Sequence, residues 1–131
     1  QRPELFNAVV CQVPLLDMQR YHTLLAGASW MAEYGNPDKP EDWAFIRQYS
    51  PYQNVKPGMK LPKVLFVTST RDDRVHPGHA RKMAARMLEQ GHPLLYWENI
   101  EGGHGGAADN GQRAQMQALE YAFLWHQLGG R

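Results

Sequence analysis

The sequence has 131 residues, of which 43% are hydrophobic and 21% are charged, values that are ordinary for one globular domain with one core. Its 14 basic and 13 acidic side chains leave a net charge of +1, which gives no electrostatic reason to expect nucleic acid or an anionic membrane as partner. No apolar run approaches the ~20 residues of a membrane span.

The single cysteine, Cys11, excludes an internal disulfide but does not indicate a compartment. No signal peptide is visible, so we expect a soluble protein and leave cytoplasm and periplasm open. The chain opens "QRPELF" without a methionine, and we therefore expect a piece of a longer protein or a processed product.

The first half of the chain predicts one strand followed by a mixed helical region. Residues 8–13, within "FNAVVCQVPLL", form an apolar run that predicts a buried strand ended by Pro14. Residues 17–35 predict loops or short helical turns. In "NPDKPEDWAFIRQYSP", Pro40 and the acids that follow it are typical of a helix start, and Pro51 is expected to stop that helix.

The second half alternates regularly. Residues 63–70 predict a second strand, 77–91 an amphipathic helix, 92–100 a third strand and about 109–128 a last helix. Four apolar residues of the last helix are expected to face inward: Met116, Leu119, Ala122 and Phe123. The alternation predicts an α/β fold with a parallel, helix-covered sheet.

Polar residues follow two successive strands. The stretch "TSTRDDRVHP" (68–77) ends the second strand, and "EGGHGG" (101–106) follows the third. Functional groups of parallel sheets gather at the carboxyl ends of the strands. A histidine that acts as a base needs a carboxylate on its other ring nitrogen, and Asp72 or Asp73 can supply one to His104.

The neighbours of these residues fit an acid and a base. Arg71 and Arg74 should keep the aspartates ionised through their charge. The glycines around His104 suit a loop with unusual backbone angles. From spacing alone, a salt-bridged loop at Asp72 and a turn histidine at His104 remain alternatives.

A nucleophile is missing from this pattern. Asp before His matches the α/β-hydrolase order Ser, Asp, His, but the sequence contains no G-x-S-x-G motif. Ser69, at the end of the second strand, and Cys11, inside the first, are the substitutes considered, although a cysteine in an apolar strand is usually inert. His76 and His79 form half of a metal-site pattern without a second half, so we expect neither metal nor cofactor.

Several marks of the sequence together resemble the prolyl oligopeptidase family of serine peptidases. They are "QRPELFNAVVCQVPLLDM", "SWMAEYG", "YSPYQNV", "RDDRVHP" and "GGHGG", and they span nearly the whole chain. The resemblance implies that Asp72 is the catalytic acid and His104 the base. It also implies that the nucleophilic serine and its helix precede the segment that begins at Gln1.

The resemblance also assigns a substrate pocket. Trp30 matches the tryptophan that stacks on a substrate proline, and Tyr34 lies in the same pocket. Leu15 and Val75 match apolar lining positions, and Arg74 matches an arginine that binds a backbone carbonyl of the peptide. An aromatic face suits a flat pyrrolidine ring because it buries area without requiring an N–H. Without the resemblance, Trp30 reads as an ordinary core tryptophan.

The resemblance implies a partial α/β-hydrolase fold, with residues 1–131 as the C-terminal portion of a catalytic domain that holds the last three strands of its sheet. The family's β-propeller, serine and oxyanion hole are absent from the sequence, so the chain alone lacks groups that acyl transfer needs. We expect a peptide or small ester as substrate. A stand-alone esterase, with a local nucleophile or a site shared between subunits, and an inactive binding module are the alternatives.

The expected partial fold also predicts which partners the chain has. Strand 8–13 would have lost its neighbour on one side, which leaves an apolar edge open to strand pairing. We therefore expect a homo-oligomer, a two-fold dimer through this edge, or a separate Ser-bearing segment as partner.

Overall fold

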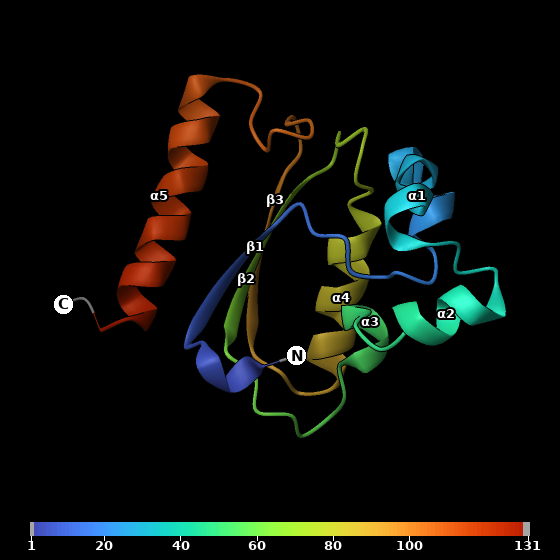
Figure 1. Cartoon of the computed structure of the whole chain (residues 1–131). Coiled ribbons are helices and arrows are strands. Elements are labelled where there is room, and N and C mark those ends of the chain that lie inside the picture. The colour runs from blue at the N-terminus through green and yellow to red at the C-terminus, as the bar shows by residue number, and fades with distance from the viewer. Residues whose placement is uncertain (1, 130–131) are drawn as a thin grey trace.

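The computed structural model describes residues 2–129 and contains a three-stranded parallel sheet with helices on both faces (Figure 1). The strands are β1 (Ala8–Gln12), β2 (Lys63–Ser69) and β3 (Leu94–Asn99), and they lie in the order β1-β2-β3. The α/β class and the parallel sheet predicted from the sequence are therefore confirmed.

The helices are α1 (Met31–Tyr34), α2 (Pro40–Ile46), α3 (Pro51–Asn54), α4 (Gly78–Glu89) and α5 (Asn110–Gln127), with 3₁₀ turns η1 (Pro3–Leu5), η2 (Tyr21–Thr23) and η3 (Leu25–Trp30). The role predicted for Pro51 was wrong. Pro51 does not stop α2, which already ends at Ile46, but opens α3, because the fixed φ of proline suits the first turn of a helix.

The two faces of the sheet carry separate cores because strand side chains alternate. On one face Phe66 of β2 packs with Met83 and Met87 of α4. On the other face Leu65 packs in one cluster with Phe123 of α5. Figure 1 shows α4 and α5 on opposite sides of the strands. β2 is buried from both sides, which explains its continuous apolar run.

The inward face of α5 differs from the prediction at two positions. Leu119 is 40% exposed and Ala122 is exposed, whereas Glu120 is buried. The carboxylate of Glu120 accepts a hydrogen bond from Nε2 of Gln12 on β1 at 2.5 Å. This polar contact turns the helix so that Met116, Glu120 and Phe123 form the stripe that faces the sheet.

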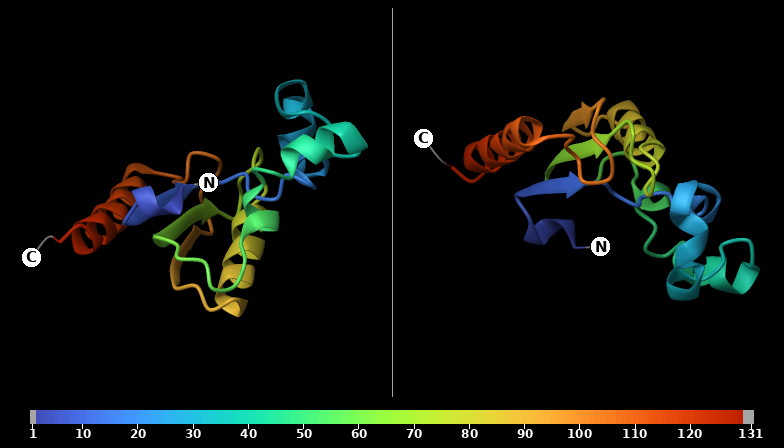
Figure 2. Two further views of the ribbon diagram at one scale, coloured as in Figure 1. Left: turned by 60° about the horizontal axis from the view of Figure 1, so that its bottom comes forward. Right: turned by 90° about the horizontal axis from the view of Figure 1, so that it is seen from above.

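Besides the two cores of the sheet, the chain between β1 and α3 forms a third packed unit, which lies beside the sheet (Figure 2). Its core is the buried set Met18, Tyr21 and Ile46. The predicted strand 8–13 ends one residue early, at Gln12, because Val13 has a φ of 38°. This left-handed conformation is unusual for a β-branched residue, and it lies where the chain leaves β1 for the third unit.

Both outer strands have a free edge within the described residues. β1 pairs with β2 along Ala8–Gln12, and no other described strand adjoins it. The open edge expected for strand 8–13 is thus present, and the dimer that would cover it stays a prediction. In the described part of the chain, no helix is long and apolar enough to cross a bilayer.

Candidate active site

Asp72 lies in a tight turn directly after β2, and backbone amides hold its carboxylate. Its Oδ1 accepts the N–H groups of Arg74 and Val75, both at 2.9 Å, and its side chain is fully buried. Two backbone amides therefore contact this carboxylate, and the expected effect of the neighbouring arginine charges stays a prediction. An aspartate that bonds amides two and three residues on forms a local turn of its own.

His104 lies against this carboxylate from the loop after β3. Its Nδ1 is 3.0 Å from Oδ2 and 3.1 Å from Oδ1 of Asp72. An ionised carboxylate only accepts, so Nδ1 carries the proton and Nε2 is the basic nitrogen of the neutral ring. The His104 side chain is 36% exposed, whereas Asp72 is covered. The pairing expected from the sequence is present in the structure.

The glycines of "EGGHGG" are needed for close backbone approach. A Cβ on Gly102 would lie 2.6 Å from the carbonyl oxygen of Gly106, and Gly106 has a φ of 80°. Asn99, the last residue of β3, donates from Nδ2 to the same Gly106 oxygen at 3.0 Å. Asn99 was not predicted as part of this site, although a polar residue that ends an apolar strand before a glycine loop is a usable signal.

The residues expected in the pocket fall into two groups. Leu15, Trp30 and Tyr34 pack together around the core of the third unit. Arg74 and Val75 belong to the turn that holds Asp72. A backbone hydrogen bond from Ala26 N–H to the Arg74 carbonyl, at 3.2 Å, connects the groups.

Neither substitute nucleophile lies in a reactive environment. Ser69 is fully buried, and its Oγ has no hydrogen-bond partner among the described residues. Burial raises the pKa of the Cys11 thiol to about 11, so the thiol stays protonated near neutral pH. These environments indicate that both side chains contribute to packing and do not attack a substrate.

The two histidines weighed as a half metal site have separate roles. Nδ1 of His76 accepts the N–H of Gly78 at 2.9 Å, at the start of α4. His79 is buried, and its Nδ1 accepts the N–H of Asp17 at 3.1 Å. Within residues 2–129, no group of three or more His, Cys, Asp or Glu side chains is placed to hold a metal.

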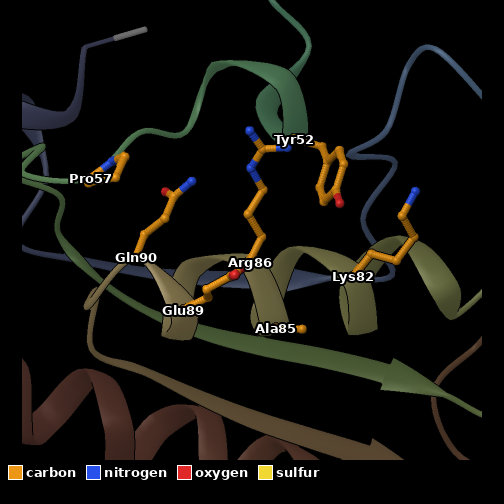
Figure 3. A pocket seen from close by; sticks show the side chains of 7 residues that line it. All are labelled: Tyr52, Pro57, Lys82, Ala85, Arg86, Glu89 and Gln90. Carbon is orange, nitrogen blue, oxygen red and sulfur yellow. The ribbon is translucent and has the colours of Figure 1, made fainter.

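A cavity of about 630 Å³ lies between α3, the loop at Pro57 and α4, away from these residues (Figure 3). Nζ of Lys82 and the guanidinium of Arg86 lie 4.5 and 4.8 Å from the ring centre of Tyr52. Lys82 also forms an ion pair with the buried Asp17. Lys82 and Arg86, the two cations that line the cavity, therefore already contact Tyr52. Neither Asp72 nor His104 lines this cavity.

Comparison with known sequences decides the family. The profile described as "Prolyl oligopeptidase family" matches residues 1–131. The chain belongs to the prolyl oligopeptidase family. The "Uncharacterized peptidase y4nA" of Sinorhizobium fredii is 56% identical over 128 residues, which are 98% of this chain and 18% of the relative. The chain thus spans about a fifth of the length of this family member.

Solved members of the family share the fold. A prolyl endopeptidase structure is 43% identical with a TM-score of 0.91, over 100% of this chain and 20% of that one. A post-proline cleaving enzyme from Rickettsia typhi is 40% identical with a TM-score of 0.90, over 98% of this chain and 19% of that one. The three parallel strands and their helices therefore correspond to part of an α/β-hydrolase catalytic domain, as expected from the sequence.

Proposed function

We propose that this chain supplies the acid and base of a Ser-Asp-His triad in a peptidase that cleaves after proline. The observation that carries the proposal is the pair of contacts between Nδ1 of His104 and the buried carboxylate of Asp72. Residues 1–131 would then form the C-terminal portion of a catalytic domain, and family membership supports the hydrolase class.

The geometry supports a defined role for each group. The carboxylate of Asp72 keeps the proton on Nδ1 of His104 and stabilises the imidazolium when it forms. Nε2 then removes the proton of a serine hydroxyl as this hydroxyl attacks the scissile carbonyl, and later gives the proton to the leaving amine. Water releases the acyl group in a second, equivalent cycle.

The serine is proposed to come from polypeptide outside these 131 residues. The sequence has no nucleophile elbow, Ser69 is buried, and the partly buried Cys11 has a thiol pKa raised to about 11. The serine could belong to the same longer protein, or to a partner that pairs with the open edge of β1. In this proposal Leu15, Trp30 and Tyr34 form the apolar wall of the proline pocket, with Arg74 and Val75 beside the acid.

A chimera tests this proposal. The 131 residues replace the matching segment of the Sinorhizobium peptidase, and in this proposal the rest of that peptidase supplies the serine. The measurement is hydrolysis of a chromogenic amide with proline on the acyl side. We expect cleavage by the chimera and a fall of about 10⁴-fold in kcat for Asp72→Asn, because the histidine loses its orienting acceptor. A folded chimera that is inert beside an active parent contradicts the proposal.

The neighbouring acid provides a matched control. Asp73 is exposed and has the same side chain, so Asp73→Asn should change kcat by less than about twofold. The isolated chain and its His104→Ala variant are assayed in parallel with p-nitrophenyl acetate. Turnover by the isolated chain that the variant lacks would favour a stand-alone esterase instead. Tight binding of a prolyl amide with no turnover by the chimera would favour an inactive binding module.

A further inference from the structure

A buried histidine outside the acid–base pair connects the two parts of the candidate site. His79 lies in the first turn of α4, four residues after Val75, and is 1% exposed. Its Nδ1 accepts the backbone N–H of Asp17 at 3.1 Å. Asp17 in turn follows Leu15 by two residues. This hydrogen bond therefore links the segment that carries Leu15 to the segment that carries Asp72, in addition to the bond between Ala26 and Arg74.

Apart from the ion pair of Asp17 with Lys82 of α4, two hydrogen bonds from backbone groups of this segment lead to a different element. The N–H of Met18 donates to Oγ of Ser50 at 3.1 Å, and the carbonyl of Leu16 accepts the N–H of Tyr52 at 3.0 Å. Both partners belong to α3 and the residue before it. They fix the segment within the third unit but do not set its position relative to Asp72.

The bond from Asp17 requires a neutral His79 ring with a free lone pair on Nδ1. The charged and titratable groups that influence this ring are the Asp17 carboxylate, the Lys82 ammonium and the His76 ring. Burial, together with Lys82 and His76, lowers the pKa of His79 to about 4, against the opposing effect of Asp17. The ring therefore remains an acceptor near neutral pH.

The Asp17 carboxylate is satisfied separately. It accepts from Nε2 of Gln53 at 2.7 Å and forms the ion pair with Lys82. These contacts hold the pKa of Asp17 below its usual value although burial acts in the opposite direction. Since its charge is already balanced, Asp17 does not require a protonated His79.

We propose that His79 is a positioning residue, whose Nδ1 holds the Asp17 amide and thereby sets the proline pocket relative to the loop of Asp72. The proposal rests on the proposed function of that pocket. His79 touches neither substrate nor the reacting atoms in this scheme, and it acts through the segment that carries Leu15.

Two variants of nearly equal size separate the hydrogen bond from the packing. In His79→Asn, Oδ1 occupies a place close to that of Nδ1 and can accept the same amide, whereas His79→Leu fills similar space without an acceptor. The first measurement is the Kd of N-acetyl-L-prolinamide for the 131-residue chain, by NMR titration at pH 7. We expect His79→Leu to weaken binding about fivefold, the value of one net hydrogen bond, and His79→Asn to stay within about twofold of wild type.

A second measurement reports on the bond without relying on the pocket. Exchange of the Asp17 amide should be at least about tenfold faster in His79→Leu than in His79→Asn, because only the latter retains an acceptor. In the wild type, binding should also weaken below about pH 4, where His79 gains a proton, and His79→Asn should lack this step. Circular dichroism confirms that each sample is folded.

The outcomes are distinct. Equal Kd values or equal exchange rates in the folded Leu and Asn variants would overturn the role of His79. A wild-type chain that does not bind the prolinamide would overturn the proline pocket, and with it the proposed function, whatever the exchange rates show.

Discussion

The loops that carry Asp72 and His104 (the acid loop) and the third unit between β1 and α3 (the aromatic unit) are neighbours, but different forces stabilise them. Around Asp72 and His104, backbone amides, glycines and one amide side chain form hydrogen bonds over short distances. Around Tyr21 and Ile46, which are both fully buried, the contacts are mostly between aromatic and aliphatic side chains. The first region depends on exact backbone geometry and the second on buried area and volume.

This difference has a consequence for function. A base must be held within a few tenths of an ångström of its acid, and backbone hydrogen bonds provide such precision. The proposed pocket for a proline ring would need shape and apolar surface, which side-chain packing provides. Variants that disturb one region should therefore leave the other largely intact, and three predictions test this from the largest expected effect to the smallest.

The largest effect is expected from Ile46→Ala in the aromatic unit. Ile46 is 0% exposed, and its truncation leaves a cavity that should lower the free energy of unfolding by about 3 kcal/mol. Its neighbour Phe45 is 64% exposed, so Phe45→Ala should cost less than about 0.5 kcal/mol. Urea denaturation measures both. The His104 ring signals in NMR should stay unchanged in Ile46→Ala, and a shift there would contradict the separation of the two regions.

A smaller effect is expected from Gly102→Ala in the acid region. The new Cβ would meet the Gly106 carbonyl at 2.6 Å, and a backbone atom cannot yield as a flexible side chain does. We expect a loss of about 2 kcal/mol in unfolding free energy and a displaced His104 ring. Gly105→Ala is the control, since nothing lies within 4 Å of its added Cβ. Similar losses in both variants would show that close approach at Gly102 is not the cause.

The smallest effect is expected from Glu98→Gln on β3, beside the acid loop. Hydrogen bonds from Arg81, then from Thr70, lower the pKa of Glu98 to about 2, despite its partial burial. Glu98 should contribute about 1 kcal/mol, since Arg81 is largely exposed and solvent screens the pair.

The contribution of Glu98 has a defined pH dependence. It is fully present above the unfolded pKa of about 4.5 and disappears as the pH falls towards 2, because the lowered folded pKa means that only the unfolded chain takes up the proton in this window. Urea midpoints of wild type and Glu98→Gln should therefore converge between pH 5 and pH 2. Glu89→Gln at an exposed position is the control variant. A difference between the urea midpoints of wild type and Glu98→Gln that stays constant from pH 5 to pH 2 would argue against the ion pair as its source.

The predictable part of this protein lies in its local patterns. The continuous apolar run of β2 indicated burial on both faces, and proline, glycine and acidic residues marked the helix ends. The positions of Asp72 and His104 at the ends of successive parallel strands indicated that they meet, and the structure brings them to 3.0 Å. Each of these inferences needs only neighbouring residues and the general rule that parallel strands end at one edge.

The features that were missed depend on contacts between distant residues. The face that α5 presents follows from the bond between Gln12 and Glu120, which are 108 residues apart. The left-handed Val13 breaks a strong β-propensity where the chain turns into the third unit. His79 reads in the sequence as a metal-site fragment, yet its partner is a backbone amide 62 residues earlier.

The sequence by itself thus determined the order of strands and helices, the family and the contact between Asp72 and His104, because each follows from local patterns along the chain and from the rule that parallel strands end at one edge. Only the tertiary structure decided how Asp72 is held, which face of α5 is buried and what His79 binds. Nearly every residue has a backbone N–H, whatever its side chain, so the sequence does not indicate which amide a side chain will bond in the folded protein.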